Sequence, residues 1–179
     1  MTLHHPTVLF DLDGTLTDPR EGITRSIQYA LAKLGIDEPD LTKLEHFIGP
    51  PLLQAFMQFY AFDEAKAWEA VNFYRERFKV TGLYENRVFD GVMPLLEELN
   101  SQGRQLYVAT SKPEVTAVEV LEHFDLASFF DCICGATFDQ SHVSKSDVIA
   151  SLLEQIGTDA DAVMVGDTAF DVIGAAAHG

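Results

Sequence analysis

Residues 7–18 read TVLFDLDGTLTD, and this stretch decides the fold. Its first six residues, TVLFDL, form a short apolar run that is rich in β-favouring side chains. Such a run is typical of a strand that is buried on both faces of a parallel sheet. Acidic and hydroxyl side chains begin at Asp11, near the end of this run, and continue to Asp18. The pattern therefore predicts a buried first strand with polar chemistry at its carboxyl end.

Further along the chain, from Gly91 onward, helical and strand patterns alternate. Helices are expected over residues 92–102, 113–124, 145–156 and 169–177, and strands over residues 105–110, 130–134 and 162–165. Alternation of this kind is typical of a parallel α/β sheet. With the first strand included, the expected fold class is α/β, a doubly wound parallel sheet with a Rossmann-like core. The sequence stops at Gly179 where another strand is expected, so we expect the C-terminal end of this core to be missing.

The intervening segment is predicted to be helical throughout. A helix start is expected at Asp18, with Pro19 as the first helical residue, and a stop at Gly35. Further helices are expected near residues 41–47, 52–60 and 63–79, where recurring aromatic side chains are interpreted as the core of a small bundle rather than a cofactor groove. The predicted organisation is an α/β core from residues 1–18 and 85–179, with residues 19–84 inserted as a helical cap.

Composition restricts the possible partners. Twelve Lys and Arg against 28 Asp and Glu give a formal net charge of −16, which argues against nucleic acid and membrane surfaces as partners because both are polyanions. No apolar run approaches the roughly 20 residues of a membrane span, and residues 1–8 lack a secretory signal, so a cytoplasmic location is expected. Cys132 and Cys134 are interpreted as reduced, structural thiols, because a bridge two residues apart on a strand is strained and no further metal ligands are nearby.

The ends of the predicted strands hold the candidate functional residues, because open α/β sheets bind ligands there. These positions, together with Lys145 at the start of the helix after the third strand, carry acids, hydroxyls and a lysine: Asp11, Asp13, Thr110, Ser111, Lys145, Asp167 and Asp171. Carboxylates gathered together repel unless a cation lies among them, and oxygen ligands favour a hard ion such as Mg²⁺. A phosphoryl group would complete its coordination, with Thr110 and Lys145 neutralising the other phosphate oxygens. Taken alone, Asp18 or Asp171 equally fits a helix cap, and Lys145 a solvated lysine.

Four segments together resemble the motifs of the haloacid dehalogenase superfamily of phosphohydrolases, in its phosphoglycolate-phosphatase-like branch with a helical cap. They are residues 11–18 (DLDGTLTD), residues 108–113 (VATSKP), Lys145 and residues 165–171 (VGDTAFD). The resemblance implies that Asp11 attacks phosphorus to form an aspartyl-phosphate, while Asp13 protonates the leaving oxygen and then activates water. It also implies Mg²⁺ held by the Asp11 carboxylate, the Asp13 main-chain carbonyl and Asp167, with Asp171 acting through water. Thr110, Ser111 and Lys145 would hold the phosphate.

The implied activity is Mg²⁺-dependent hydrolysis of a small phosphorylated metabolite, either phosphoglycolate or a nucleotide or sugar phosphate. An acid at Asp13 favours phosphate-ester hydrolysis, because dehalogenase and phosphonate-cleaving members lack it. Residues 46–52, HFIGPPL, are similar to the cap's specificity loop, and the alternative interpretation of their glycine and prolines is a simple helix break. Cap cations that are candidates for contacting the substrate are Arg20, Arg25, Lys43, Arg75 and Lys79. Ser146 stands where relatives often have proline, a change expected to affect only the helix start.

Two other functions share much of this pattern. A phosphosugar mutase of the same superfamily carries every motif and returns the phosphate to a rebound intermediate. A signalling receiver domain also uses an acceptor Asp, Mg²⁺, a hydroxyl and a Lys, but Asp13 and the long cap favour a phosphatase over a receiver. A monomer or a homodimer is expected.

Overall fold

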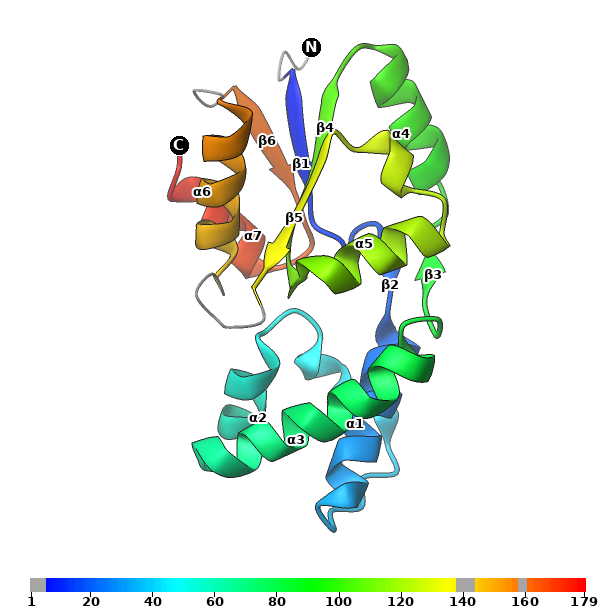
Figure 1. The fold of residues 1–179 in the computed structure, drawn as a ribbon, viewed down its shortest axis with the longest axis vertical. Coiled ribbons are helices and arrows are strands. Elements are labelled where there is room, and N and C mark those ends of the chain that lie inside the picture. The colour runs from blue at the N-terminus through cyan, green and yellow to red at the C-terminus, as the bar shows by residue number, and fades with distance from the viewer. Residues whose placement is uncertain (1–5, 138–143, 158–160) are drawn as a thin grey trace. The chain divides into compact units, whose positions relative to one another are not determined.

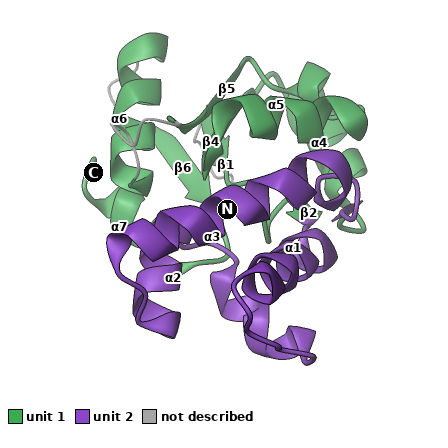
Figure 2. Ribbon diagram, turned by 60° about the horizontal axis from the view of Figure 1, so that its bottom comes forward, with its two compact units in different colours: residues 1–17, 88–179 green, residues 18–87 purple. Residues whose placement is uncertain are grey.

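The computed structural model describes residues 6–137, 144–157 and 161–179. The chain divides into two compact units, coloured separately in Figure 2. The core unit comprises residues 1–17 and 88–179, and the helical unit comprises residues 18–87. That the helical unit acts as a cap stays a prediction.

A four-stranded parallel sheet forms the centre of the core unit. Its order is β5 (Cys132–Ala136), β4 (Gln105–Pro113), β1 (Thr7–Phe10) and β6 (Ala162–Val165). Phe10 at the end of β1 is in register with Val108 on one side and Val165 on the other. All four residues of β1 are buried, as the apolar run predicts. The predicted α/β class with a parallel sheet is confirmed.

Helices cover both faces of this sheet (Figure 1). Helices α4 (Val92–Ser101) and α5 (Glu114–His123) lie on one face, and α6 (Lys145–Ile156) and α7 (Ala169–Ala176) lie on the other. Under α6, side chains from alternate strand positions such as Leu9 and Tyr107 pack against Val148, Ile149 and Leu152. Burying one such leucine stabilises the fold by about 1.5–3 kcal/mol. This packing fixes the sheet and therefore the residues at its carboxyl edge.

The helical unit contains three α-helices and two shorter helical segments in the described residues. They are α1 (Arg20–Lys33), the 3₁₀ segment η1 (Leu41–Phe47), α2 (Leu52–Tyr60), α3 (Glu64–Arg77) and the π-helical segment η2 (Phe78–Gly82). Phe47 and Phe56 are fully buried with ring centroids 4.9 Å apart, and Phe62 stacks on Phe56. The interpretation of these aromatic side chains as a bundle core is confirmed. Phe59, at 39% exposure, lies at its margin.

The predicted start of the first helix was wrong by one residue. Helix α1 begins at Arg20, and Pro19 precedes it as the N-cap residue. Asp18 instead ends the two-residue strand β2 (Thr17–Asp18), which pairs with β3 (Arg87–Val88). The Asp18 carboxylate lies 2.9 Å from Arg87 Nη2, and it also accepts a hydrogen bond from the Arg20 main chain. Asp18 therefore has two partners: Arg87 on the paired strand β3 and the main chain at the start of α1.

Two strand predictions were also shifted. The strand expected over residues 105–110 continues to Pro113, and the one expected over residues 130–134 lies at Cys132–Ala136. The extension of β4 brings a register irregularity between Thr110 and Pro113, where two residues of β4 have no opposite partner on β5. None of the described helices is long and apolar enough to span a membrane.

Candidate active site at the carboxyl edge of the sheet

The site begins where β1 ends. Because β1, β4 and β6 are parallel and in register, the residues that follow them reach the same edge of the sheet. Asp11 is the first residue after β1, and its main-chain N–H donates to the Val165 carbonyl at 2.9 Å, which extends the ladder by one residue. Asp11 is 6% exposed. The backbone therefore fixes Asp11 firmly at the centre of this edge.

Three of the predicted acids come together here. Carboxylate oxygens of Asp11, Asp167 and Asp171 lie within 4.8 Å of one another, with Asp11 and Asp171 buried and Asp167 exposed. Asp167 also accepts a hydrogen bond from the Thr15 hydroxyl at 3.3 Å. An all-oxygen set at this spacing fits a small hard cation such as Mg²⁺, which takes a few carboxylates and completes its shell with water or phosphate. The Asp13 side chain is outside this set; its predicted contribution is a main-chain carbonyl.

Lys145 is buried between two of these acids. Its Nζ lies 2.8 Å from Asp11 Oδ1, 2.9 Å from Asp171 Oδ1 and 3.1 Å from the Ala109 carbonyl, and its side chain is 3% exposed. The alternative of a solvated lysine is therefore wrong. Lys145 reaches this position because α6 begins there, capped by Ser144 and Asp147. Ser146 follows it inside the helix without disturbing that start.

Burial and Lys145 set the charge states of the two buried acids. Burial raises the pKa of Asp11, the charge and hydrogen bond of Lys145 oppose that rise, and Asp171 adds to it. Burial also acts to raise the pKa of Asp171, but the hydrogen bond and charge of Lys145, with bonds from Thr168, lower it overall. Asp171 also completes a capping box with Thr168 at the start of α7. The two interpretations of Asp171, cap and site residue, are therefore compatible.

Two glycines allow the acids to approach this closely. Gly14 has a φ of +87°, and a Cβ there would lie 2.6 Å from Asp167 Cγ. A Cβ on Gly166 would collide with the Asp171 carboxylate. Only glycine fits either position, so both belong to the geometry of the site.

The C-terminal half of β4 carries the remaining predicted site residues, Thr110 and Ser111. Thr110 is buried and hydrogen-bonds to Asp11, and its hydroxyl oxygen accepts from the Lys112 main chain at 3.2 Å. Ser111 is half-buried beside it. Lys112 was not among the predicted site residues, yet its Nζ lies 2.5 Å from Asp13 Oδ2 with a side chain 5% exposed. The only available signal was its place in the string TSKP.

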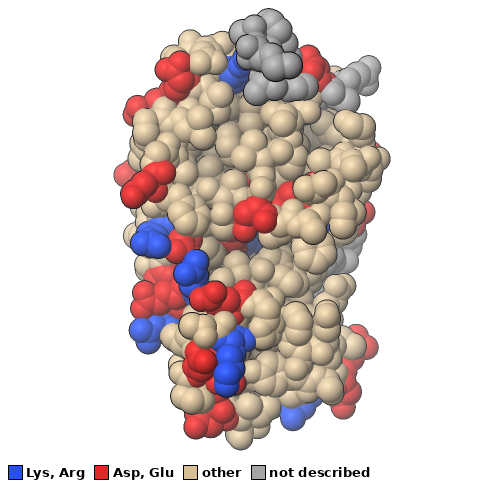
Figure 3. Space-filling view, turned by 180° about the vertical axis from the view of Figure 1, so that it is seen from behind, with Lys and Arg blue, Asp and Glu red and all other residues tan. Residues whose placement is uncertain are grey.

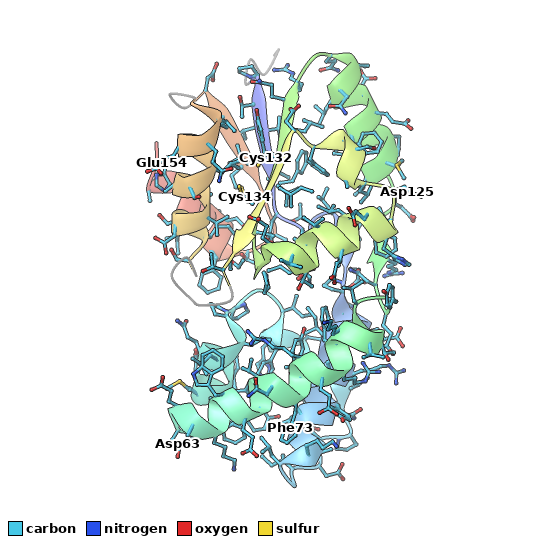
Figure 4. The ribbon with its side chains drawn as sticks, in the orientation of Figure 1. Asp63, Phe73, Asp125, Cys132, Cys134 and Glu154 are labelled. Atoms are coloured by element: carbon cyan, nitrogen blue, oxygen red, sulfur yellow. The ribbon has the colours of Figure 1, made fainter. Side chains whose placement is uncertain are left out.

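The two cysteines are separate from this site. Cys132 and Cys134 come from β5 beside α6, and both are free thiols with their sulfur atoms 3.7 Å apart (Figure 4). Burial raises the pKa of Cys134 to about 12, so its reactive thiolate form is scarce. The interpretation as reduced structural thiols agrees with this arrangement.

Among the candidate cap cations, Arg20, Arg25 and Lys43 each lie beside an acid, whereas Arg75 lies over the Trp68 ring. A hollow in the helical unit is lined in part by Arg20, Arg25 and Arg87. Each of these lies near an acid: Glu45 at 3.6 Å, Glu21 at 2.9 Å and Asp18 at 2.9 Å. On the face drawn in Figure 3, basic side chains likewise stand beside acidic ones.

A parallel α/β sheet with a buried acid after its first strand, a carboxylate cluster and a buried lysine is typical of enzymes that act on phosphate groups. Residues 8–179 match the haloacid dehalogenase-like hydrolases, and the chain belongs to this family. It is 61% identical over 178 residues to a 5′-nucleotidase of Pseudomonas aeruginosa, covering 99% of this chain and 80% of that protein. The family assignment and the predicted class of phosphoric monoester hydrolase are confirmed.

Two further relatives are informative. The crystal structure of a predicted phosphatase from Clostridium acetobutylicum superposes with a TM-score of 0.93 at 48% identity, covering 96% of this chain and 80% of that one. Tyrosine-protein kinase PtkA of Mycobacterium tuberculosis is 43% identical over 173 residues, but this chain spans only 59% of its length. The family thus carries phosphoryl-transfer chemistry under more than one name.

Proposed function

We propose that this phosphatase hydrolyses nucleoside 5′-monophosphates through an aspartyl-phosphate on Asp11, with Mg²⁺ as its metal. The 61% identity to a 5′-nucleotidase supports this substrate class over phosphoglycolate or a sugar phosphate. The observation that carries the mechanism is the buried Asp11, held at the sheet edge beside Asp167, Asp171 and Lys145. The expected cytoplasmic location, and the choice between monomer and homodimer, stay predictions.

Asp11 is held in one orientation suited to attack. Its Oδ1 accepts a hydrogen bond from the Leu12 main chain at 2.7 Å and lies 2.8 Å from Lys145 Nζ. We therefore assign Oδ2 as the attacking oxygen. A bond forms between Oδ2 and phosphorus while the ester P–O bond breaks, and Asp13 gives its proton to the leaving 5′-oxygen. A water then attacks phosphorus as Asp13 takes a proton from it, which releases phosphate and restores Asp11.

The remaining groups balance the charge of the phosphoryl group. Thr110, Ser111 and Lys145 are assigned to its oxygens, each by a hydroxyl or ammonium. Asp11, Asp167 and the Asp13 carbonyl would hold Mg²⁺, with Asp171 acting through water, and the ion would supply positive charge that offsets the repulsion between Asp11 and the phosphate. We assign the helical unit the role of a cap, with residues 46–52 contacting the leaving group.

The test is phosphate release from a panel of nucleoside 5′-monophosphates, phosphoglycolate and glucose 6-phosphate, with and without Mg²⁺. Asp11→Asn should reduce turnover at least 10³-fold, because an amide is a poor nucleophile, while Asp125→Asn serves as a matched control. Asp125 is an exposed residue with φ +58° at the end of α5, a conformation that Asn accepts (Figure 4). Wild-type turnover by the Asp11 variant would contradict the mechanism. An isomerised sugar phosphate in place of free phosphate would identify a mutase.

A further inference from the structure

Asp13 and Lys112 form a buried pair beside the acid cluster. Lys112 Nζ lies 2.5 Å from Asp13 Oδ2, and their side chains are 5% and 15% exposed. The other oxygen, Asp13 Oδ1, is buried and has no hydrogen-bond partner among the described residues. One oxygen of this carboxylate is therefore fixed by a cation, and the other is left available.

Lys112 reaches Asp13 because of the irregularity in β4. Between Thr110 and Pro113 the strand leaves its register with β5, and the Lys112 main-chain N–H turns to the Thr110 hydroxyl at 3.2 Å. The neighbouring strand makes room for this detour at Gly135, where a Cβ would lie 2.6 Å from the Lys112 carbonyl and from the main chain of Glu114. A bulge of this kind redirects a side chain relative to the regular alternation of the strand. The irregularity in β4, the Thr110 hydroxyl and Gly135 thus together position the Lys112 ammonium group.

We propose that Lys112 is a positioning residue for phosphate-ester hydrolysis: it holds Asp13 by Oδ2 so that Oδ1 is the oxygen that exchanges a proton with the leaving group and then with water. The proposal rests on the proposed function, because it assigns a partner to the acid and base of that mechanism. Lys112 itself contacts neither phosphate nor metal in this assignment. Its effect should therefore appear in turnover and pass entirely through Asp13.

A double-mutant cycle tests this directly. Lys112→Met should lower kcat about 10–100-fold and leave KM within about 3-fold, the usual cost of losing a group that orients a site residue. Lys112→Arg should restore part of the loss because it keeps a cation within reach of Asp13. In an Asp13→Asn background, Lys112→Met should cost less than about 2-fold further, since there is no carboxylate left to position. Lys66→Met, at an exposed lysine of the helical unit, is the control for removing a charge.

A pre-steady-state measurement adds a second readout. With p-nitrophenyl phosphate the leaving group needs little protonation, so loss of Asp13 orientation should slow mainly the hydrolysis of the aspartyl-phosphate. Lys112→Met should then show a burst of p-nitrophenol in quenched flow that the wild-type protein lacks. Lys112→Gln, whose side chain is polar but shorter and uncharged and so removes the ammonium from Asp13, carries the same test if the methionine variant does not fold.

Two outcomes would overturn the proposal. A raised KM with unchanged kcat, or an equal loss in the wild-type and Asp13→Asn backgrounds, would show that Lys112 binds the substrate itself. Failure of the proposed function is recognised separately, because Asp11→Asn would then keep its activity whatever Lys112 does.

Discussion

Lys145 balances the charges of the site at the scale of single residues. The cluster of Asp11, Asp167 and Asp171 carries three negative charges when ionised, and Lys145 supplies one positive charge between two of them. Three minus one leaves two negative charges, which one divalent cation cancels. Asp13 pairs with Lys112 beside this group. The charges of the three acids and Lys145 therefore match one divalent cation, without any further basic side chain.

Gly14 offers a test of Asp167 as a metal ligand. Gly14→Ala should push the Asp167 carboxylate away, because the new Cβ would lie 2.6 Å from its Cγ. We expect the affinity for Mg²⁺ and kcat/KM each to fall about 10–100-fold, as when the support of a ligand is lost. Mg²⁺ titrations followed by calorimetry and by phosphate release measure both quantities.

Gly103→Ala is the matched control for that change. Gly103 also has a positive φ, +71°, but a Cβ there meets nothing within 4 Å. Gly103→Ala should cost the same strain of about 1 kcal/mol for a left-handed backbone conformation, and it should keep normal metal binding. Normal metal affinity in Gly14→Ala would instead remove Asp167 from the ligand set.

Sequence reasoning found the acids because their positions follow from strand ends alone. The apolar run TVLFDL predicted a strand that ends near Asp11, β1 in fact ends at Phe10, and parallel strands bring such ends to one edge. Lys112 was missed because its position depends on the irregularity in β4 and on Gly135 of the neighbouring strand. The periodicity of the sequence does not predict such an irregularity. The pairing of Asp18 with Arg87, 69 residues away, was missed for the same reason: it is a tertiary contact.

At the scale of elements, ion pairs tie the end of α3 to the segment that leads into β3. Arg77 donates to Glu85 through two nitrogens at 2.7 and 2.9 Å, and also to the Ser26 hydroxyl of α1. The Glu85 main-chain carbonyl accepts from Gly22 of α1. A single acid therefore connects α1, α3 and the returning chain.

This pair predicts a pH dependence of the helical unit. The hydrogen bonds of Arg77 lower the pKa of Glu85 below its ordinary 4.5. Ionised Glu85 therefore stabilises the fold above pH 4.5, and this stability is lost as the pH falls through the lower, folded-state pKa. Glu85→Gln should cost about 1 kcal/mol of unfolding free energy at pH 7, and this difference should shrink below about pH 4.

The measurement is urea unfolding followed by the fluorescence of Trp68, the single tryptophan, which lies on α3. Glu97→Gln, at an exposed glutamate of α4, is the control and should change little at any pH. An Arg77–Glu85 contribution that stays constant from pH 7 to pH 3 would contradict the assigned ion pair.

Element types were easier to predict than element ends. The alternation after Gly91 predicted β4, β5 and β6, and the apolar run at residues 7–12 predicted β1, because periodicity extends over several residues. Ends depend on single contacts: α1 starts one residue late where Asp18 pairs with Arg87, and β4 runs on to Pro113 where it can still bond to β5. Local signals such as Asp-Pro therefore give the neighbourhood of a boundary but not its residue.

At the scale of the whole molecule, a net charge of −16 surrounds a site for an anionic substrate. The described site holds only two lysines, Lys112 and Lys145, and both are already paired with acids. Long-range repulsion should therefore slow the encounter with a nucleotide at low ionic strength, where the Debye length reaches about 30 Å at 0.01 M.

Raising the salt should consequently speed the reaction with a nucleoside monophosphate. With Mg²⁺ held at saturation, kcat/KM should increase about 2–5-fold between roughly 10 and 150 mM salt, because screening shortens the range of the repulsion to about 8 Å. The value of kcat should stay nearly constant, because the long-range repulsion acts on the approaching substrate and not on substrate that is already bound. Potassium and tetramethylammonium chloride should act alike if screening is the cause. A steady fall of kcat/KM with salt would mean that the local positive charge of Mg²⁺ and the site, rather than the net charge of the protein, governs the approach of the substrate.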